Sequence, residues 1–341
     1  MSRNIKIIDL FAGIGGIRLG FEKASKNKID CVFTSEWNKY SAQTYLENFN
    51  DFKVYGDITE IKEDFIPDHD ILLAGFPCQP FSQAGLKKGF SDTRGTLFFD
   101  IERILIHKKP QAFLLENVKQ LRGHDKGRTL ETILAHLKEI GYNNVQYKVL
   151  RARDFGLPQN RERIYIVGFL DDNIKFEFPQ PTFEPTKVGD ILEKEVEDKY
   201  TISDKLWAGH QRRKRENKLK GKGFGYGMVN ENSEYTNTLS ARYYKDGSEV
   251  LIQQKDKNPR KLTPRECARL QGFPDTFKIP VSNTQAYRQF GNSVPVKVVE
   301  KVAEQMIRHL NLGIKPEKVY QRNDSKKINR KHVSENLTTN I

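Results

Sequence analysis

The sequence has few cysteines and no long apolar run, and these absences exclude several classes of protein. Its 341 residues include only Cys31, Cys78 and Cys267, which lie far apart and form no Cys-x-x-Cys pair. We therefore expect no metal site and no disulfide framework, so any functional cysteine acts as a thiol. No stretch approaches the roughly 20 consecutive apolar residues that span a bilayer. Internal repeats are absent as well.

The segment nearest the N-terminus is the one candidate for a targeting signal. Residues 5–21 are rich in apolar side chains, but Asp9, Arg18 and several glycines interrupt them, and no small-residue cleavage site follows. This pattern predicts a buried strand and turn rather than a signal peptide. We therefore expect a cytoplasmic protein.

Positive charge is present in excess. Lysine and arginine number 57 against 44 aspartates and glutamates, which gives a net charge of +13. Such an excess favours a polyanionic partner, and nucleic acid is the commonest one. The alternative is that the additional lysines are simply solvated.

The first half of the chain alternates short β-like runs with helical stretches. This alternation predicts a parallel sheet with helices on both faces. The expected strands are 5–9, 30–35, 70–74, 112–115 and 163–169, and the expected helices are one after Gly16 and those at 39–49, 96–107 and 130–140.

The pattern changes near Asp171. From there to about residue 261 the chain is polar and contains prolines, the basic run 212–215 and a glycine cluster at 221–227. We interpret this part as a separate, irregular module. A helix at 262–271 follows, because Thr263-Pro264 places a cap residue before a proline of the first turn. A final helix is expected at 294–310.

A glycine-rich turn follows the first expected strand. Residues 9–16 read Asp-Leu-Phe-Ala-Gly-Ile-Gly-Gly, and glycines allow the backbone to approach a ligand closely. The dinucleotide fingerprint fails because Arg18 stands where its third glycine belongs, which disfavours a nicotinamide oxidoreductase. The carboxylate of Asp9 suits a ligand with a cationic amino-acid end.

Two further acids extend this ligand hypothesis. Glu36 ends the second expected strand, where an acid commonly binds ribose hydroxyls. Asp57 is placed to accept a hydrogen bond from an adenine amine. Together they indicate an adenosine ligand without a pyrophosphate, and S-adenosylmethionine fits. The alternative is a plain connection between a strand and a helix.

Cys78 lies in the segment Gly-Phe-Pro-Cys-Gln-Pro at 75–80, directly after an apolar run. Open α/β sheets place their ligands at this end of a strand, and the flanking prolines stiffen the turn. We therefore interpret Cys78 as a nucleophile, whereas Cys31 and Cys267 are expected to be buried as small apolar residues. The glycine-containing loop at 81–95 is typical of a lid.

Charged residues also end one other apolar run and open the last one. Glu116 follows the run at 112–115, and packing does not explain an acid there, although a structural ion pair would. Residues 159–163 read Gln-Asn-Arg-Glu-Arg, and strand alternation places Gln159, Arg161 and Arg163 on one face. Arginines beside a carboxylate and a thiol can bind a phosphate or a base carbonyl.

These motifs, in this order, resemble those of the DNA (cytosine-5)-methyltransferase family, and the compact length resembles its bacterial type II restriction–modification branch. The resemblance rests on residues 9–16, 75–80, 116–118, 159–163, 262–274 and 291–295. It implies an α/β fold with a Rossmann-like S-adenosylmethionine-dependent methyltransferase sheet and a smaller irregular target-recognition domain. The implied domains are a catalytic domain of residues 1–183 and 283–320, a target-recognition domain of residues 184–282 and a basic tail of residues 321–341.

The resemblance also implies a role for each candidate residue. Cys78 would attack C6 of a flipped-out cytosine, and Glu116 would hold N3 and the amino group. Arg163 would contact the base carbonyl, while Arg161 would help to position the site. The implied S-adenosyl-L-methionine pocket comprises Phe11, Gly13, Gly15, Glu36, Trp37, Asp57, Ile58, Leu97 and Asn292. The implied DNA contacts are Gln79, Ser82, Gln83, Thr238, Arg242, Tyr243 and Lys245.

The implied partner is double-stranded DNA with a short specific site, bound by a monomer in the bacterial cytoplasm. A cognate restriction endonuclease would act on the same site without needing to bind this chain. Two alternatives stay open. A tRNA cytosine-5 methyltransferase is disfavoured by the module at 184–282, and a non-catalytic DNA-binding relative is disfavoured by intact Cys78, Glu116 and Arg163.

Overall fold

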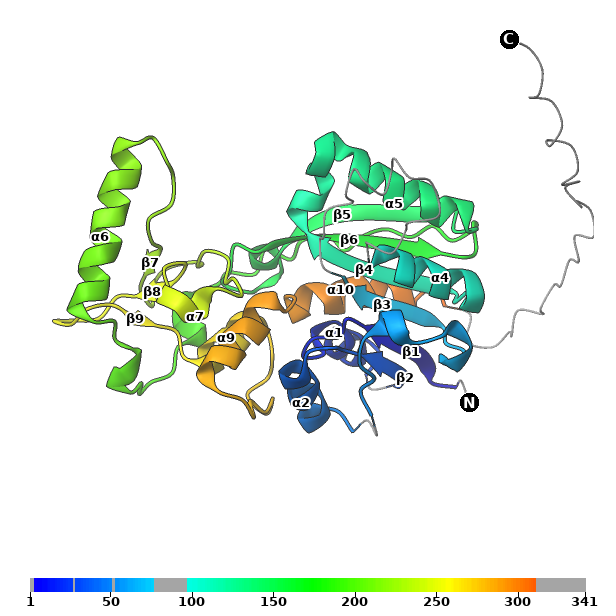
Figure 1. Ribbon diagram of the computed structural model, residues 1–341, viewed down its shortest axis with the longest axis horizontal. Coiled ribbons are helices and arrows are strands. Elements are labelled where there is room, and N and C mark those ends of the chain that lie inside the picture. Colours follow the sequence, from blue (N-terminus) through cyan, green and yellow to red (C-terminus); the bar gives the residue numbers. More distant parts are fainter. Residues whose placement is uncertain (1–2, 27, 51–52, 77–96, 311–341) are drawn as a thin grey trace, which may run out of the picture.

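A six-stranded mixed sheet forms the centre of the larger of two lobes (Figure 1). The computed structural model describes residues 3–26, 28–50, 53–76 and 97–310. The strand order is β2-β1-β3-β4-β6-β5. The strands are β1 (Ile5–Leu10), β2 (Ile29–Ser35), β3 (Ile71–Gly75), β4 (Ala112–Val118), β5 (Asn144–Arg151) and β6 (Glu162–Phe169).

The last two strands differ from the sequence prediction. β6 runs antiparallel to both β4 and β5, so the expectation of a fully parallel sheet is wrong at this edge. Antiparallel neighbours need no helical crossover, and the connection from β5 to β6 contains only a 3₁₀ turn, η6 (Ala152–Phe155). β5 was not predicted, because most of its residues are only half buried and several are polar.

Helices cover both faces of the sheet, as predicted. On one face α1 and α10 pack against Ile7, Leu73, Leu114 and Tyr165. On the other face α4 and α5 pack against the alternate residues of the same strands, such as Leu72. Because the central strands are buried on both faces, they appear in the sequence as continuous apolar runs. The helices of the large lobe are α1 (Gly16–Ala24), α2 (Lys39–Asn48), α4 (Phe98–Lys108), α5 (Arg128–Glu139) and α10 (Val296–Ile307).

The C-terminal helix α10 returns to the large lobe after the chain has built the small one. It packs directly against α1, and a Cβ atom placed on Gly20 would lie 2.6 Å from Cγ1 of Val299. Glycine is therefore needed there for close helix packing, which brings the two ends of the described chain together. No helix within the described residues is both long and apolar enough to cross a membrane.

The small lobe has a three-stranded sheet of order β7-β8-β9 and, beside it, an apolar core that continues into the large lobe through Ile14, Tyr45 and Phe49. Its elements are α6 (Asp204–Leu219), β7 (Met228–Val229), α7 (Tyr243–Asp246), β8 (Leu251–Ile252), β9 (Arg260–Lys261), α8 (Pro264–Leu270) and α9 (Asn283–Asn292). Short 3₁₀ turns complete the two lobes, namely η1 (Ile58–Glu60), η2 (Glu63–Phe65), η4 (Lys119–Arg122), η5 (His124–Gly127), η7 (Val188–Ile191) and η8 (Asp198–Tyr200).

Helix α8 confirms the capping signal read from the sequence. The Thr263 hydroxyl accepts a hydrogen bond from the Glu266 N–H at 3.1 Å, and the Glu266 carboxylate accepts one from the Thr263 N–H at 2.8 Å. This reciprocal capping box satisfies two N–H groups at the helix start. Glu266 is fully buried and also pairs with Arg260 at 2.7 Å.

Helix α9 packs in the small lobe, although the sequence analysis assigned residues 283–320 to the catalytic domain. The ring of Tyr287 lies 5.2 Å from that of Tyr243, and its hydroxyl donates to the Leu262 carbonyl. Phe290 packs against Phe273. The Gln289 side chain of α9 also accepts from the Thr44 hydroxyl and donates to the Tyr40 carbonyl of α2. Helix α9 therefore contacts both lobes.

A buried arginine joins the two lobes. Arg161 has no exposed surface. Its guanidinium donates to the carbonyl of Leu239 in the small lobe at 2.7 Å, and to the carbonyls of Gly291 and Ser293 at 3.0 and 2.5 Å. Burial lowers the pKa of this guanidinium from its ordinary value, so the carbonyl contacts must offset the cost of removing a charge from water.

Two buried glutamines extend this connection. The Gln159 side chain accepts from the Leu239 N–H at 3.0 Å and donates to the Leu270 carbonyl and the Gln271 side chain. Gln271 in turn donates to the Phe290 carbonyl at 2.7 Å. Residues just before β6 thereby hold three separate segments of the small lobe.

Replacing Arg161 with methionine should destabilise the protein strongly. The change removes three charge-assisted hydrogen bonds and leaves buried carbonyls unpaired, for an expected loss of about 3 kcal/mol in the free energy of unfolding. Urea denaturation measures this loss. The matched control is Arg212→Met, because the Arg212 side chain is 72% exposed and its loss should cost less than about 0.5 kcal/mol. Equal losses in the two variants would contradict the role of Arg161.

Candidate active site

Predicted functional residues meet at one edge of the large sheet. β1, β3 and β4 are parallel neighbours, so their carboxyl ends lie together, where open α/β sheets bind ligands. Glu116 near the end of β4 is paired with Gly75 at the end of β3. A Cβ atom on Gly75 would lie 3.5 Å from the Glu116 carboxylate. The carboxylate is therefore next to the chain that leads into Pro77 and Cys78.

Four predicted site residues lie outside the described residues. They are Cys78, Gln79, Ser82 and Gln83, within the segment 77–96. Phe76 is the last described residue before them, and it is buried at the end of the site.

Glu116 and Arg163 form a buried ion pair. The Arg163 Nε lies 3.1 Å from Oε1 of Glu116, with both side chains at most 13% exposed. Strand alternation places them on the same sheet face as Leu114 and Tyr165. Burial raises the pKa of the Glu116 carboxyl, although Arg163 and Arg161 oppose the shift. A carboxyl in this environment takes up a proton more readily than an exposed one.

Asn117 is a site residue to which the sequence analysis gave no role. It is 3% exposed, and its amide donates to the carbonyl of Phe76 at 3.0 Å while its oxygen accepts from the Val118 N–H. It thereby fixes the main chain two residues before Cys78. The available signal was a second polar residue, next to Glu116, at the end of an otherwise apolar strand.

The glycine turn after β1 has a left-handed backbone at several positions. The φ angle is +54° at Phe11, +56° at Gly13 and +81° at Gly15. A Cβ on Gly15 would lie 2.2 Å from the Phe49 ring, whereas one on Gly13 would have no atom within 4 Å. Gly15 is therefore required for packing, and Gly13 leaves its main chain open to a ligand.

Glu36 closes the other side of this turn. Its carboxylate accepts from the Gly13 N–H at 2.8 Å and from the Asn38 N–H at 2.7 Å. Its pKa is raised by burial, which outweighs the effect of these two hydrogen bonds. The predicted acid and the predicted glycine turn are thus in direct contact.

The remaining predicted cofactor residues surround the same edge. Trp37 is 77% exposed beside Glu36, and the Glu36 N–H donates to the Tyr55 carbonyl, which brings the segment with Asp57 alongside. The Asp57 carboxylate caps η1 by accepting from the Thr59 N–H. Ile58 is buried, Leu97 precedes α4 half-buried, and Asn292 is exposed at the end of α9. A Cβ on Gly16 would lie 2.7 Å from the Ser293 hydroxyl, so the residues around Asn292 adjoin the glycine turn.

These residues fit S-adenosylmethionine. A buried carboxylate can accept hydrogen bonds from ribose hydroxyls, an exposed indole can pack on the adenine, and the open main chain at Gly13 allows close approach. Among the described residues, no cluster of histidine, cysteine, aspartate and glutamate could hold a metal ion.

The predicted DNA contacts in the small lobe have different environments. Arg242 and Lys245 are exposed around α7, and the half-buried Thr238 donates to the Asn160 carbonyl at 2.6 Å. Tyr243 is fully buried, with its hydroxyl donating to Val250 and accepting from Leu262. The expectation that Tyr243 contacts DNA is therefore corrected, because its side chain packs in the core. Arg161, also fully buried, is a positioning residue.

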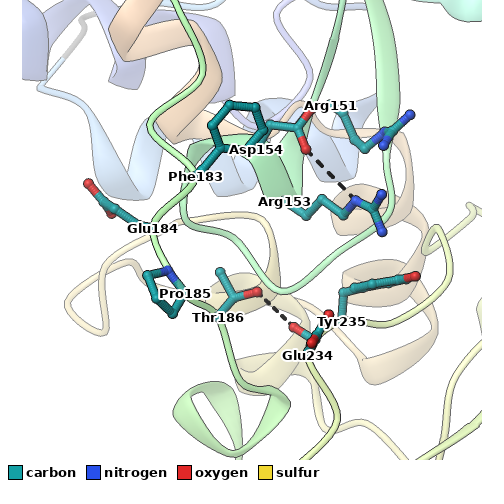
Figure 2. Close-up of a pocket in the computed structure, with 9 residues that line it drawn as sticks. All are labelled: Arg151, Arg153, Asp154, Phe183, Glu184, Pro185, Thr186, Glu234 and Tyr235. Atoms are coloured by element: carbon teal, nitrogen blue, oxygen red, sulfur yellow. Dashed lines mark hydrogen bonds and ion pairs between the residues drawn. The ribbon is translucent and has the colours of Figure 1, made fainter.

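A surface groove of about 480 Å³ lies where the chain crosses between the lobes (Figure 2). The Arg153 guanidinium lies 4.4 Å from the centre of the Tyr235 ring, and the Thr186 hydroxyl donates to the Glu234 carbonyl. The groove is lined by Arg151, Arg153, Asp154, Phe183, Glu184, Pro185, Thr186, Glu234 and Tyr235. None of the predicted site residues lines it, so it is separate from the site at the sheet edge.

The mixed sheet, the glycine turn held by Glu36 and the buried Glu116–Arg163 pair define an S-adenosylmethionine-dependent methyltransferase. A family model described as "C-5 cytosine-specific DNA methylase" matches residues 5–308. The chain therefore belongs to the C-5 cytosine-specific DNA methylase family. It is an enzyme whose methyl donor is S-adenosyl-L-methionine and whose substrate is cytosine in DNA.

Similar proteins cover most of the chain. It is 70% identical over 301 residues to the type II methyltransferase M.NlaX of Neisseria lactamica, covering 88% of this chain and 96% of that relative. It is 63% identical to the type II methyltransferase M.SsoII of Shigella sonnei, covering 90% and 81%. The structure of the S. pombe Dnmt2 methyltransferase is similar in fold, with a TM-score of 0.74, 23% identity, and coverage of 90% and 100%.

Glu36→Gln should weaken the binding of S-adenosylmethionine by about 10- to 100-fold, because a charged hydrogen-bond acceptor becomes neutral. Titration calorimetry measures the affinity. Since burial raises the pKa of Glu36, lowering the pH through that pKa should weaken binding to the wild type but not to the variant. Glu139→Gln, an exposed change at the end of α5, is the control. Unchanged affinity in Glu36→Gln would refute the assignment.

Proposed function

We propose that this enzyme methylates C5 of a cytosine within a short specific duplex site, and thereby protects that DNA in a restriction–modification system. The observation that carries the proposal is the buried Glu116–Arg163 pair next to Gly75, three residues before Cys78. The names of relatives at 63–70% identity, which are type II methyltransferases, support the restriction–modification role.

Cys78 supplies the nucleophile in this proposal. C5 of cytosine is a poor nucleophile, so the thiolate first forms a bond from sulfur to C6 and converts the ring into an enamine. S-adenosylmethionine, held by the glycine turn and Glu36, would supply the electrophilic methyl group for the electron pair at C5, and its S–CH3 bond would break to leave S-adenosylhomocysteine. A base removes the proton from C5, the C5–C6 double bond re-forms, and the thiolate leaves.

Glu116 and Arg163 stabilise the base while this charge develops. The raised pKa of Glu116 allows its carboxyl to hold a proton towards N3 of the ring, while its second oxygen accepts from the amino group. Arg163 donates to the base carbonyl and keeps the carboxyl oriented through its contact at 3.1 Å. Asn117 acts as a positioning residue because it holds the Phe76 carbonyl.

The small lobe supplies recognition. The target cytosine must leave the duplex stack, at a cost of a few kcal/mol, while neighbouring bases are read in place. The exposed Arg242 and Lys245 are proposed readers, since these residue types pair well with guanine. Gln79, Ser82 and Gln83 stay proposed contacts, and Thr238 is proposed to act through the main chain.

The broader setting is also part of the proposal. We assign residues 1–183 and 283–320 to the catalytic domain, apart from the packing of α9, and residues 184–282 to target recognition. The basic tail at 321–341 lies outside the described residues. We propose that a monomer acts in the bacterial cytoplasm, and that a cognate endonuclease cleaves the same site without binding this chain.

Cys78→Ser should abolish methyl transfer while leaving DNA binding largely intact, because a serine hydroxyl is a far weaker nucleophile than a thiolate. Transfer of the methyl group is measured with labelled S-adenosylmethionine and unmethylated duplex DNA, with tRNA as a control substrate. Bisulfite sequencing then locates the methylated cytosines. The wild type should protect cytosines at one recurring short site. Label in tRNA alone would contradict the DNA function, and substantial transfer by the variant would contradict the nucleophile.

Glu116→Gln should slow the single-turnover rate of methylation by about 100- to 10,000-fold, the usual range for a lost general acid or base. Cofactor affinity should stay the same, because Glu116 pairs with Arg163 rather than with the glycine turn. Rapid-quench kinetics measure the rate, with the exposed Glu139→Gln as control. A near-normal rate in Glu116→Gln would remove this residue from the mechanism.

A further inference from the structure

Helix α6 and the residues after it carry a concentration of positive charge that the base-reading role does not explain. Residues 204–222 include eight lysines and arginines and two acids, for a net charge of +6 out of +13 for the whole chain. α6 forms the end of the small lobe farthest from the large sheet (Figure 1). Its sequence was not predicted to be helical.

Apolar packing contributes little to this helix, apart from the Trp207 ring, which lies 5.0 Å from the Tyr226 ring. His210 is its only buried residue, and Leu219 near its end is 87% exposed. A helix without an apolar stripe needs another source of attachment. Here that source is polar, because Arg213 lies 3.1 Å from the Asp246 carboxylate and donates to the Gly225 carbonyl. The His210 ring lies 3.1 Å from the Asp246 carbonyl.

These contacts fix α6 to the proposed base-reading turn. Asp246 is the last residue of α7, the short helix beside which Arg242 and Lys245 are exposed. A duplex held against α7 therefore lies at a fixed position relative to α6. Because Arg213 contacts the carboxylate of Asp246 and His210 contacts its carbonyl, α6 has little freedom to move relative to α7.

Three of the eight basic residues contact other side chains of the lobe, and the other five form no ion pair there, within the described residues. Arg213 is paired, the Lys214 ammonium lies 4.2 Å from the Tyr226 ring, and Arg212 lies 3.8 Å from Glu216. The others are exposed, and none forms an ion pair with a residue of the described chain. They are Lys205, Arg215, Lys218, Lys220 and Lys222.

The length of α6 matches a stretch of duplex longer than a short site. Its 16 residues span about 24 Å at 1.5 Å per residue. Base pairs follow one another every 3.4 Å, so the helix extends along about seven of them. Lysine and arginine side chains on such a span can contact phosphates without reading sequence.

We propose that residues 204–222 form a clamp on the DNA backbone that flanks the recognised bases. The clamp rests on the proposed function, because α7 must face the duplex for α6 to lie beside it. Its phosphate contacts add affinity that depends on the length of the duplex and on salt, but not on sequence. Binding of these residues to flanking phosphates raises the occupancy of DNA without changing the chemical step.

The test compares two triple variants that remove equal charge. The clamp variant is Arg215→Gln/Lys218→Gln/Lys222→Gln. The control is Lys23→Gln/Lys28→Gln/Lys175→Gln, three exposed lysines at the opposite end of the large sheet. Fluorescence anisotropy measures the Kd of each protein for duplexes of about 12 and 30 base pairs over a range of salt concentrations. Thermal unfolding checks that both variants fold.

On the 30-base-pair duplex, the clamp variant should bind at least tenfold more weakly than the wild type. The slope of its plot of log Kd against log salt concentration should be smaller than that of the wild type by about two to three, because each lost phosphate contact reduces the slope by about 0.9. On the 12-base-pair duplex it should match the control. Its kcat at saturating DNA should equal that of the wild type, while KM rises.

Two results would overturn the clamp. They are equal salt slopes for the two triple variants, and an equal loss of affinity on both duplex lengths. Binding needs no turnover, so these outcomes are distinguishable from failure of the proposed function. That failure would appear instead as wild-type protein that methylates no duplex DNA.

Discussion

The buried guanidinium of Arg161 is the contact on which the arrangement of the two lobes depends. It reaches the Leu239 carbonyl of the small lobe, the Gly291 carbonyl near the end of α9 and the Ser293 carbonyl just after it. A charged donor without exposed surface is tolerated only where its N–H groups find acceptors. In this arrangement of the lobes the two terminal nitrogens find acceptors, although Nε has none among the described residues. The contact therefore sets where the small lobe lies relative to the sheet.

Two residues further along, on β6, lies the arginine of the pair that is proposed to take part in the catalytic chemistry. Arg163 lies on β6 against Val118 of β4 and pairs with Glu116. Removing water from a carboxylate is costly, so a buried Glu116 must either be paired or protonated. Its raised pKa shows that burial outweighs the arginines. The carboxyl of the pair therefore takes up a proton more readily than an exposed one, which is a property that acid–base chemistry uses.

The sequence was most informative where local physics decides the structure. Central strands buried on both faces, the capped start of α8 and the glycine turn were predictable because each depends on a few adjacent residues. β5 and α6 were not, because their side chains are half-exposed and their positions depend on distant partners such as Asp246. The direction of β6 was missed for a related reason, since strand direction depends on the connection and not on the strand. Tyr243 looked like a reader beside Arg242 and Lys245, but its burial is a property of the assembled core.

These contacts distinguish the environments of the two arginines in the motif Gln-x-Arg-x-Arg. Alternation places its three side chains on one face, so the sequence cannot say which arginine touches the substrate and which is structural. The structure separates them by depth, since Gln159 and Arg161 bind Leu239 from both its N–H and its carbonyl. Leu239 lies only four residues before Tyr243, the anchor of α7. The path from the Glu116–Arg163 pair to the proposed base-reading turn is therefore short, and hydrogen bonds from Gln159 and Arg161 to Leu239 lie on it. In the proposed function, a cytosine held by Arg163 and the bases read beside α7 would consequently be kept at a fixed separation, and that separation would set which cytosine of a site is modified.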